Sequence, residues 1–405
     1  MRRIMYIWRR LGTFFQAVVV CLLAAALVVS LTAIALAEVR ESSEGSLPFA
    51  LVPPAPTPAP THFPEIVMPD WDENLSEPVD DRPISLLTGL HVDEEYFSRR
   101  PIAVVINNSF GAHPQSGITC ADIVYEVLAE GNTTRIVAIF QSSIPEKIGP
   151  VRSARDYFVD FALNHDAFFV HHGGSPSGYQ RIRSLLGANS IDGIRYEGTI
   201  FWRDRSFPGW TGNTGQRSVE HSSFTSWERL NGHIDSRDVR GFFNGDANER
   251  PNYGFVFGAW PLGQESMFSD VSRVVVPFAR DIYTAFVLDD DTGLYYVEHA
   301  RGPWMDAART QASVRNILVQ RTAIRVVDDE GRRNVTTVGS GTGFLVRDGL
   351  VFNVRWEKAS HAAPMQWFFE DGSPIVLAPG RTWINVLQTS AAPEFVSRTG
   401  ETHEI

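Results

Sequence analysis

Three short apolar runs, PIAVVIN (residues 101–107), TRIVAIFQ (134–141) and AFFVHH (167–172), decide the fold of the first half of the chain. Each run is rich in β-branched or aromatic residues and is short, so each is predicted to be a buried strand. Helices are predicted at 117–130, where apolar residues recur at helical spacing, and at 153–164. Strands that alternate with helices predict an α/β domain with a mostly parallel sheet.

Two serines are predicted to begin helices after these strands. Ser175 precedes Pro176, and a capping serine followed by proline at the first helical position is typical of a helix start. Ser153 is expected to cap the helix at 153–164 through its side chain. Both helices would then begin close to the end of a strand.

The second half of the chain has a different pattern. From residue 271, short apolar runs such as RNILVQR and LVFNVRW alternate with turn sequences such as DTG at 291–293. An acidic residue before glycine favours tight turns between antiparallel strands. Residues 263–395 are therefore predicted to form an antiparallel all-β domain, a sandwich or a barrel. The α/β domain is predicted at 83–262, and residues 396–405 are predicted to be a tail.

The first 82 residues are predicted to lie outside these two domains. A basic tail at 1–17 precedes an apolar run at 18–37, which is long enough to cross a bilayer as a helix. The positive charge on its N-terminal side places the body of the protein outside the cytoplasm. Residues 38–82 contain a proline-rich stretch that favours an extended spacer. We predict a retained single-pass anchor, and the alternative is a signal peptide cleaved after Ala37.

The composition narrows the classes of function. The formal net charge is −11, and the first 37 residues carry basic residues without any acid, so the rest of the chain is more acidic still. We therefore expect no binding to nucleic acid through a general basic surface. Cys120 is the only cysteine outside the apolar run, so no internal disulfide is expected. A buried apolar role is predicted for it.

The loops at 108–117, 142–153 and 172–176 form the main candidate site. In a parallel sheet they would meet at the carboxyl ends of the strands, where α/β proteins bind ligands. Helix N-termini and glycines allow anions to approach the backbone, and arginines add paired hydrogen bonds to phosphate or carboxylate. The predicted ligand-binding residues are Gln115, Arg152, Ser153, Arg155, His171, Gly173, Gly174 and Ser175. The alternative is that these loops are ordinary connections between strands and helices.

A second candidate group is acidic. Asp122, Glu126 and Glu130 are spaced by four residues, so neighbours would lie about 6 Å apart on one face of a helix. That spacing suits a shared metal ion or an acid–base pair, whereas in a strand the neighbours would be about 13 Å apart. A solvated helix face is the alternative. The sequence contains no histidine–cysteine spacing typical of metal sites and no P-loop. No metal site or cofactor is therefore predicted. A divalent cation is considered only as a ligand of the acidic group.

Several motifs occur together in one order. They are RPIAVVINN, HPQSGITCADIVYEVLAEGNTTRIVAIFQ, IGPVRSARDYF and VHHGGSP, followed by RNILVQ, GSGTGFLVRDGLVFNVRWEK and DGSPIVLAPGRTWINV. This series, over about residues 100–386, resembles the YerB-like family of bacterial proteins described as lipoproteins. The resemblance implies a two-part extracytoplasmic protein of the bacterial envelope and supplies no established activity.

The resemblance also indicates which positions carry the family's signatures. They fall on Gln115, Asp122, Glu126, Glu130, Arg135, Arg152, Arg155 and residues 173–176. One feature departs from the family, because a plain apolar run at 18–37 replaces the lipid anchor.

We therefore predict an extracytoplasmic protein that binds an anionic cell-envelope ligand, such as a glycan or a lipid-linked precursor, or a partner protein. The binding site would be the arginine and glycine cluster at the strand ends. One alternative is an envelope phosphotransferase or hydrolase, in which acids hold a divalent cation and arginines clamp a pyrophosphate. Another is a structural adaptor that docks through the β domain. The sequence does not decide whether the protein is an enzyme.

Overall fold

The computed structural model describes residues 80–403, except 144, 243–251 and 260–262. The described residues belong to one unit. The predicted basic tail and apolar span, together with nearly all of the predicted spacer, lie outside the described residues. Within the described part of the chain, no helix is long and apolar enough to cross a membrane.

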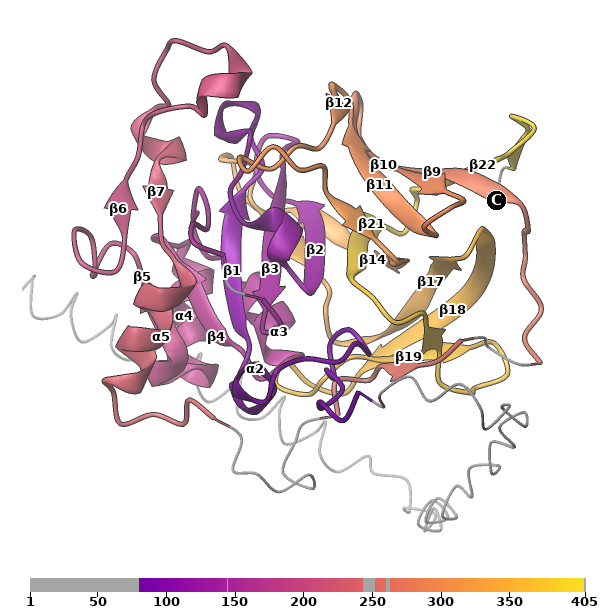
Figure 1. Cartoon of the computed structure of the whole chain (residues 1–405), viewed down its shortest axis with the longest axis horizontal. Coiled ribbons are helices and arrows are strands. Elements are labelled where there is room, and N and C mark those ends of the chain that lie inside the picture. The colour runs from indigo at the N-terminus through magenta and orange to yellow at the C-terminus, as the bar shows by residue number, and fades with distance from the viewer. Residues whose placement is uncertain (1–79, 144, 243–251, 260–262, 404–405) are drawn as a thin grey trace, which may run out of the picture. The chain divides into compact units, whose positions relative to one another are not determined.

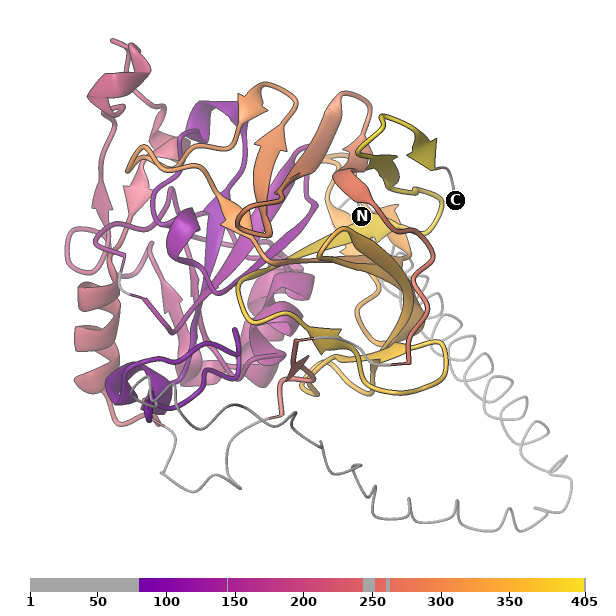
Figure 2. The same cartoon turned by 45° about the vertical axis from the view of Figure 1, so that its right-hand side comes forward.

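A 10-stranded sheet forms the centre of the fold (Figures 1 and 2). Its strand order is β19-β18-β17-β14-β21-β2-β3-β1-β4-β5. The first half of the chain supplies β1 (Ile102–Asn107), β2 (Ile123–Leu128), β3 (Thr134–Phe140), β4 (Phe168–His171) and β5 (Ser190–Asp192). The strands predicted from the three apolar runs are confirmed as β1, β3 and β4.

The second half of the chain completes the same sheet. It supplies β14 (Asn316–Thr322), β17 (Gly339–Arg347), β18 (Leu350–Lys358), β19 (Gln366–Phe369) and β21 (Thr382–Gln388). Strand β21 lies between β14 and β2 and is parallel to both. The sheet is therefore continuous across the predicted boundary between residues 262 and 263.

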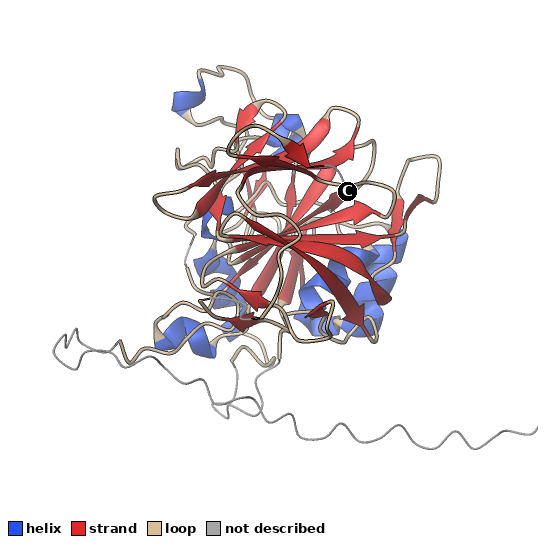
Figure 3. Cartoon of the chain, turned by 90° about the vertical axis from the view of Figure 1, so that its right-hand side faces the viewer, coloured by secondary structure: helices blue, strands red, loops and turns tan. Residues whose placement is uncertain are grey.

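A 7-stranded sheet forms a further layer (Figure 3). Its strands are β9 (Val271–Ala279), β10 (Ile282–Asp289), β11 (Leu294–His299), β12 (Gly302–Pro303), β13 (Ser313–Val314), β22 (Glu394–Ser397) and β23 (Thr402–His403). Three two-stranded ribbons are also present, formed by β6 (Trp202–Arg203) with β7 (Ser223–Phe224), β8 (Val256–Phe257) with β20 (Val376–Leu377), and β15 (Ile324–Val326) with β16 (Arg333–Val335). The described residues from 263 onward contain no helix, which confirms the all-β character of the second half. Its strands are divided between the two large sheets and the ribbons that contain β15, β16 and β20.

The prediction of a mostly parallel sheet is wrong, because the sheet is mixed. Strand β3 is antiparallel to both β1 and β2, whereas β4 is parallel to β1 and β5 is parallel to β4. The predicted helix at 117–130 is the source of the error. That segment forms a short 3₁₀ turn, η2 (Ile118–Cys120), and then β2. Because every residue of β2 is buried, its apolar residues need not alternate and can mimic a helical spacing.

Four α-helices and further 3₁₀ turns are described. They are α2 (Glu94–Ser98), α3 (Asp156–Leu163), α4 (Pro176–Leu185), α5 (Trp227–Asp235), η1 (Phe110–Ala112), η3 (Gly187–Asn189), η4 (Gly209–Thr211) and η5 (Val219–His221). The start of α4 is confirmed, since the Ser175 hydroxyl accepts the backbone N–H of Gly178. The predicted cap at Ser153 is wrong. Residues 151 and 154 form β-bridges to Ile106 and Gly174, which keeps the chain extended up to Arg155.

Two apolar layers cover the two faces of the central sheet. Successive side chains of a strand point to opposite faces, so in β1 Val104 lies in one layer and Val105 in the other. The layer containing Val104 packs against the 7-stranded sheet, and the layer containing Val105 packs against α3. Cys120, half-buried and free, packs against the first layer. Burial in both layers stabilises a unit in which no disulfide is described.

Candidate functional site

One edge of the central sheet collects most of the predicted site residues. Strands β1 and β2 point the same way, because both are antiparallel to β3, and β4 is parallel to β1. The edge at which these three strands end is called the carboxyl edge below. The loops at 108–117 and 172–176 leave from this edge, as predicted. The loop at 142–153 begins at the opposite edge and returns along β1, where the Arg152 N–H donates to the Val105 carbonyl at 2.8 Å.

The end of the predicted loop at 142–153 meets the predicted loop at 172–176 at the carboxyl edge. The backbone N–H of Ala154 donates to the Gly173 carbonyl at 2.8 Å, and that of His172 donates to the Arg152 carbonyl at 3.0 Å. Gly173 has φ +73°, a conformation that L-residues rarely adopt. Its role is therefore explained by the turn, and the hydroxyl of Ser175 is used as a helix cap.

Arg155, Arg135 and Glu130 form an ion-pair cluster at this edge. Arg155 pairs with one oxygen of Glu130, and Nη2 of Arg135 lies 3.2 Å from the other. Burial alone would raise the pKa of Glu130, but the two guanidinium charges outweigh it and hold the pKa below its usual value. Burial lowers the pKa of Arg135 to about 10. Arg155 also donates to the Ala154 carbonyl at 2.6 Å, so its donors are engaged inside the protein.

Arg152 differs from Arg155 although it lies only three positions away. It is half-buried, and it forms no ion pair with any residue that the structure describes. Its Nε atom is buried without a hydrogen-bond partner among the same residues, and burial lowers the pKa of its guanidinium. Arg152 therefore keeps hydrogen-bonding capacity that Arg155 has already used.

The three acidic residues do not form a cluster. Asp122 lies at the opposite edge, where its Oδ2 accepts the backbone N–H groups of Gln141 at 2.6 Å and Ser142 at 2.9 Å. Glu126 lies within β2, and Glu130 follows its end. A spacing of four in a strand separates such residues by about 13 Å. In the described part of the chain, no group of three histidine, cysteine or acidic side chains is placed to hold a metal ion.

Gln115 is fully buried and links the two halves of the chain. Its Nε2 donates to the Asn107 carbonyl at 3.1 Å and to Oδ1 of Asn108 at 2.8 Å. Its Oε1 accepts the indole N–H of Trp304 at 2.8 Å. Gln115 therefore supports the wall of a cavity and does not face an opening shared with Arg152 and Gly173. His171 is also buried and lines a different cavity.

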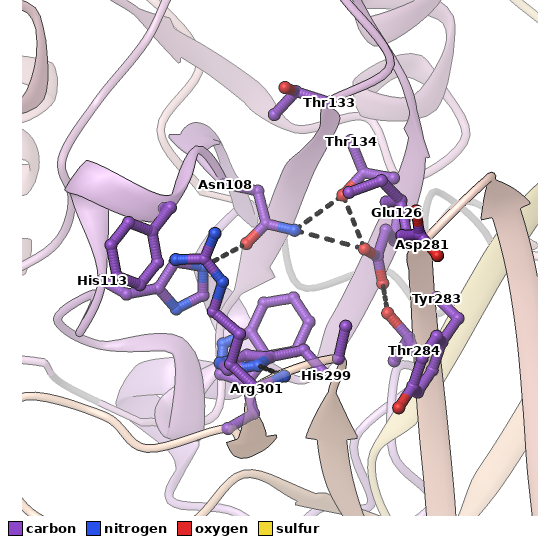
Figure 4. A pocket seen from close by; sticks show the side chains of 14 residues that line it. Asn108, His113, Glu126, Thr133, Thr134, Asp281, Tyr283, Thr284, His299 and Arg301 are labelled. Atoms are coloured by element: carbon purple, nitrogen blue, oxygen red, sulfur yellow. Dashed lines mark hydrogen bonds between the residues drawn. The ribbon is translucent and has the colours of Figure 1, made fainter.

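A cavity of about 260 Å³, called the seam pocket below, lies where the two halves of the chain meet at the carboxyl edge (Figure 4). Polar and aromatic side chains form most of its wall. The lining residues are Asn108, Phe110, His113, Glu126, Thr133, Thr134, Asp281, Ile282, Tyr283, Thr284, His299, Ala300, Arg301 and Trp304. Of the predicted site residues, only Glu126 is among them.

Glu126 forms a buried part of this pocket, and its carboxylate is saturated with hydrogen bonds. Oε1 accepts from Nδ2 of Asn108 at 3.2 Å and from the Thr134 hydroxyl at 2.7 Å. Oε2 accepts from the Thr284 hydroxyl at 2.8 Å and from the Trp383 indole at 3.2 Å. All four donors are neutral, and burial raises the pKa of Glu126 to about 7. The carboxylate thus joins β2 to β3, β10 and β21.

Two neutral histidines face each other in the wall, with ring centroids 5.0 Å apart. Nε2 of His113 lies 3.0 Å from Oδ1 of Asn108 and donates to it, so Nδ1 of His113 is an acceptor. Nδ1 of His299 accepts the backbone N–H of Arg301 at 3.1 Å, so Nε2 of His299 is a donor. Burial lowers the pKa of His113 to about 3 and also lowers the pKa of His299. The pair offers one acceptor and one donor without carrying charge near neutral pH.

Arg301 supplies a cation at the rim of the seam pocket. Its guanidinium carbon lies 3.4 Å from the centroid of the exposed Phe110 ring. Arg301 is itself exposed and forms no ion pair with any residue in the described ranges. Asp281, also exposed, contributes an opposite charge to the lining. The pocket therefore combines a buried polar interior that includes Glu126 with one exposed arginine and one exposed aspartate.

Sequence reasoning missed most of this pocket. Asn108 and His113 lie in a predicted loop but were not among the predicted ligand-binding residues. Thr284, His299 and Arg301 come from the second half, where nothing in the local sequence distinguishes them from other strand-end residues. Their proximity to Glu126 arises only because the 7-stranded sheet packs beside β2 and β3.

Comparisons with known proteins cover both halves of the chain. Family models described as "Protein of unknown function (DUF3048)" match its N-terminal domain at residues 87–240 and its C-terminal domain at residues 274–384. The chain is 32% identical over 333 residues to "Putative lipoprotein YerB" of Bacillus subtilis, which covers 79% of this chain and 88% of the relative. The crystal structure of the YerB protein from Bacillus subtilis matches with a TM-score of 0.64 at 29% identity, covering 77% of this chain and 99% of that one.

Proposed function

Because the chain belongs to the YerB-like family of DUF3048 proteins, whose models describe proteins of unknown function, we propose a function from the geometry of its seam pocket. The protein is an extracytoplasmic binding protein, and the pocket takes a small anionic glycan of the cell envelope. The observation that carries this proposal is the guanidinium of Arg301, which stands without an acidic partner among the described residues at the rim of a polar pocket.

The wall of the pocket supports a sugar as the ligand. Sugars present hydroxyl groups that both donate and accept, and the two neutral histidines offer one acceptor and one donor. Aromatic rings from Phe110, Tyr283 and Trp304 provide apolar surface beside these polar atoms. Arg301 adds a cation that can form paired hydrogen bonds with a carboxylate or phosphate substituent. A lipid-linked precursor fits the same chemistry through its sugar or phosphate group.

The location in the cell envelope rests on two further observations. A relative that is 32% identical is named "Putative lipoprotein YerB", and the run at 18–37 has the composition of a membrane anchor. We place the body outside the cytoplasm, held by this segment or released after cleavage at Ala37. Docking of a partner protein through the second half remains the adaptor alternative.

The geometry favours binding over catalysis. An acid–base catalyst needs a carboxylate oxygen that is free to reach the substrate, but both oxygens of Glu126 already accept two hydrogen bonds each. The phosphotransferase alternative needs acids that share a metal ion, but Asp122 precedes β2, Glu126 lies within it and Glu130 follows its end. The hydrogen bonds and ion pairs that these three acids form support a structural role for them.

The test compares two sugars that differ in one charged group. N-acetylmuramic acid carries a carboxylate that N-acetylglucosamine lacks, and binding of each to the full chain is measured by calorimetry. We expect the acidic sugar to bind more tightly, and Arg301→Gln to weaken its binding by about tenfold or more, as loss of a charge-assisted hydrogen bond predicts. Binding of the neutral sugar should not change in this variant.

Arg325→Gln is the matched control, since Arg325 is exposed in β15 and does not line the pocket. It should leave the binding of both sugars unchanged. Absence of binding by either sugar, or equal loss in both variants, would contradict the proposal. Release of a product from a bound sugar would favour the enzyme alternative.

A further inference from the structure

A second cavity, of about 480 Å³, lies beside the edge strands β4 and β5 and the helix α4. It is separate from the seam pocket, and the two share no lining residue. The lining residues are His171, Tyr179, Ile182, Gly187, Ala188, Ser190, Asp192, Arg195, Tyr196 and Arg237. It is called the arginine cavity below.

We propose that the arginine cavity binds an oxyanion group, a phosphate monoester or a carboxylate, between Arg195 and Arg237. Neither guanidinium forms an ion pair or a hydrogen bond with a residue of the described ranges. Nη1 of Arg237 is buried without a partner among those residues. A buried donor without a partner destabilises the folded protein, and an acceptor entering the cavity would remove that cost.

The acid in the lining of the cavity forms no ion pair with either of these arginines, and its oxygens accept hydrogen bonds from other groups. Oδ1 of Asp192 accepts the backbone N–H groups of Gly173 at 2.9 Å and Ile194 at 3.0 Å. Oδ2 of Asp192 accepts the Tyr179 hydroxyl at 2.8 Å. These bonds hold the side chain of Asp192, the last residue of β5, in place.

Three neutral polar side chains of the cavity, His171, Ser190 and Tyr179, already have hydrogen-bond partners within the protein. Nδ1 of His171 donates to the Gly173 carbonyl at 2.7 Å, which leaves Nε2 to accept the Ser190 hydroxyl at 2.9 Å. The Tyr179 hydroxyl is used by Asp192. The donors that remain are those of the two guanidinium groups and the Tyr196 hydroxyl, so the cavity suits a ligand group made of acceptors. A planar guanidinium binds the oxygens of carboxylate or phosphate through parallel hydrogen bonds.

Both arginines lie near the same histidine, His233, beside the cavity. The ring of His233 packs against Tyr196, with centroids 4.5 Å apart. Burial lowers the pKa of His233, and the charges of Arg237 and then Arg195 lower it further. Nε2 of His233 is buried without a partner in the described part of the chain. Both guanidinium charges therefore act on one neutral ring, and a bound anion would offset their mutual repulsion.

The test uses inorganic phosphate and acetate as probes on the full chain at low salt, where exposed charges are least screened. We expect saturable binding, detected by calorimetry or by ³¹P line broadening for phosphate. Arg237→Gln and Arg195→Gln should each weaken binding by at least tenfold. Tighter binding of phosphate than of acetate assigns the site to phosphoryl groups, and the reverse assigns it to carboxylates.

Two control variants test whether the loss of anion binding is specific to the arginine cavity. Arg183→Gln removes an exposed arginine of α4 that does not line the cavity, and it should leave binding unchanged. Arg301→Gln should also leave phosphate binding unchanged, which separates this site from the seam pocket. No saturable binding of either anion, or the same loss in the Arg183 or Arg301 variant as in the Arg237 variant, overturns the proposal.

Thermal unfolding provides a second readout. Phosphate should raise the melting temperature of the wild-type chain, because a ligand that binds the folded state stabilises it by mass action. It should not do so in the variant that combines Arg195→Gln with Arg237→Gln. Without phosphate, the combined variant should melt no lower than the wild type. A large decrease would mark the arginines as internal structural groups and would overturn the proposal.

Discussion

The ion-pair cluster and the seam pocket lie at the same edge of the central sheet but use their polar groups in opposite ways. In the cluster, Arg155 and Arg135 neutralise Glu130, and their side chains are buried. In the seam pocket, Glu126 is saturated by neutral donors while Arg301 is left without an acidic partner among the described residues. The charge of a residue therefore does not by itself indicate a binding site. What matters is whether a neighbour has already used its hydrogen-bonding capacity.

The largest effect is expected from breaking the ion-pair cluster. Arg155→Ala leaves Glu130 in a mostly buried position with Arg135 as its remaining cation. Loss of one partner of a buried pair costs about 3–5 kcal/mol, so the free energy of unfolding in urea should fall by that amount. A loss below about 1 kcal/mol would mean that the cluster is open to solvent and comparable to the rim of the seam pocket.

A pH-dependent effect should distinguish Glu126 from Glu130. The pKa of Glu126 in the folded protein is about 7, above its ordinary value of 4.5, so the folded state keeps a proton that the unfolded state releases between these values. Wild-type stability should therefore fall by about 3 kcal/mol, relative to Glu126→Gln, as the pH rises from 4.5 to above 7. Urea unfolding of both proteins at several pH values measures this difference. If the difference in the free energy of unfolding between the two proteins stays constant with pH, burial does not raise the pKa of Glu126.

A smaller effect is expected from removing one donor to Glu126. Thr284→Val keeps the shape of the side chain but removes the hydroxyl that donates to Oε2. The free energy of unfolding should fall by about 1 kcal/mol, and the pKa of Glu126 should rise further because one bond to the charged form is lost. Thr342→Val, at an exposed position of β17, is the control and should change neither quantity. Equal effects in both variants would contradict the proposed saturation of Glu126.

The smallest effect is expected at Arg152. It forms no ion pair with a described residue, so Arg152→Gln should change the free energy of unfolding by less than about 0.5 kcal/mol. Arg155→Ala is measured in the same urea titration, because the two arginines lie three positions apart and only Arg155 has an ion pair with a described residue. A loss as large as that of Arg155→Ala would place Arg152 inside the cluster.

The local parts of the fold were predictable, and the long-range pairings were not. The buried runs of β1, β3 and β4 and the serine cap of α4 are short-range signals that the structure confirms. Strand β2 was mistaken for a helix because both of its faces are buried and its pattern carries no clear period. That error also turned Asp122, Glu126 and Glu130 into an apparent cluster.

The candidate site was harder to predict than the fold. The contact of Gln115 with Trp304 joins residues that are 189 positions apart, and that of Glu126 with Trp383 joins residues 257 positions apart. Neither contact can be recognised from the residues that surround it in the sequence. The pairing of β21 with β2 brings Trp383 to Glu126, and the packing of the 7-stranded sheet on the central sheet brings Trp304, which follows β12, to Gln115.

From the amino-acid sequence alone we could identify β1, β3 and β4 as buried strands, the start of α4, the all-β character of the second half, and the family that the motifs resemble. These properties follow from local hydrophobic patterns and capping residues, which act over a few positions. Only the tertiary structure decided the directions of the strands, the sharing of one sheet by both halves, and which arginines and acids satisfy each other. Hydrogen bonds and ion pairs form over a few ångströms between residues that are far apart in the chain, so their saturation depends on the folded arrangement.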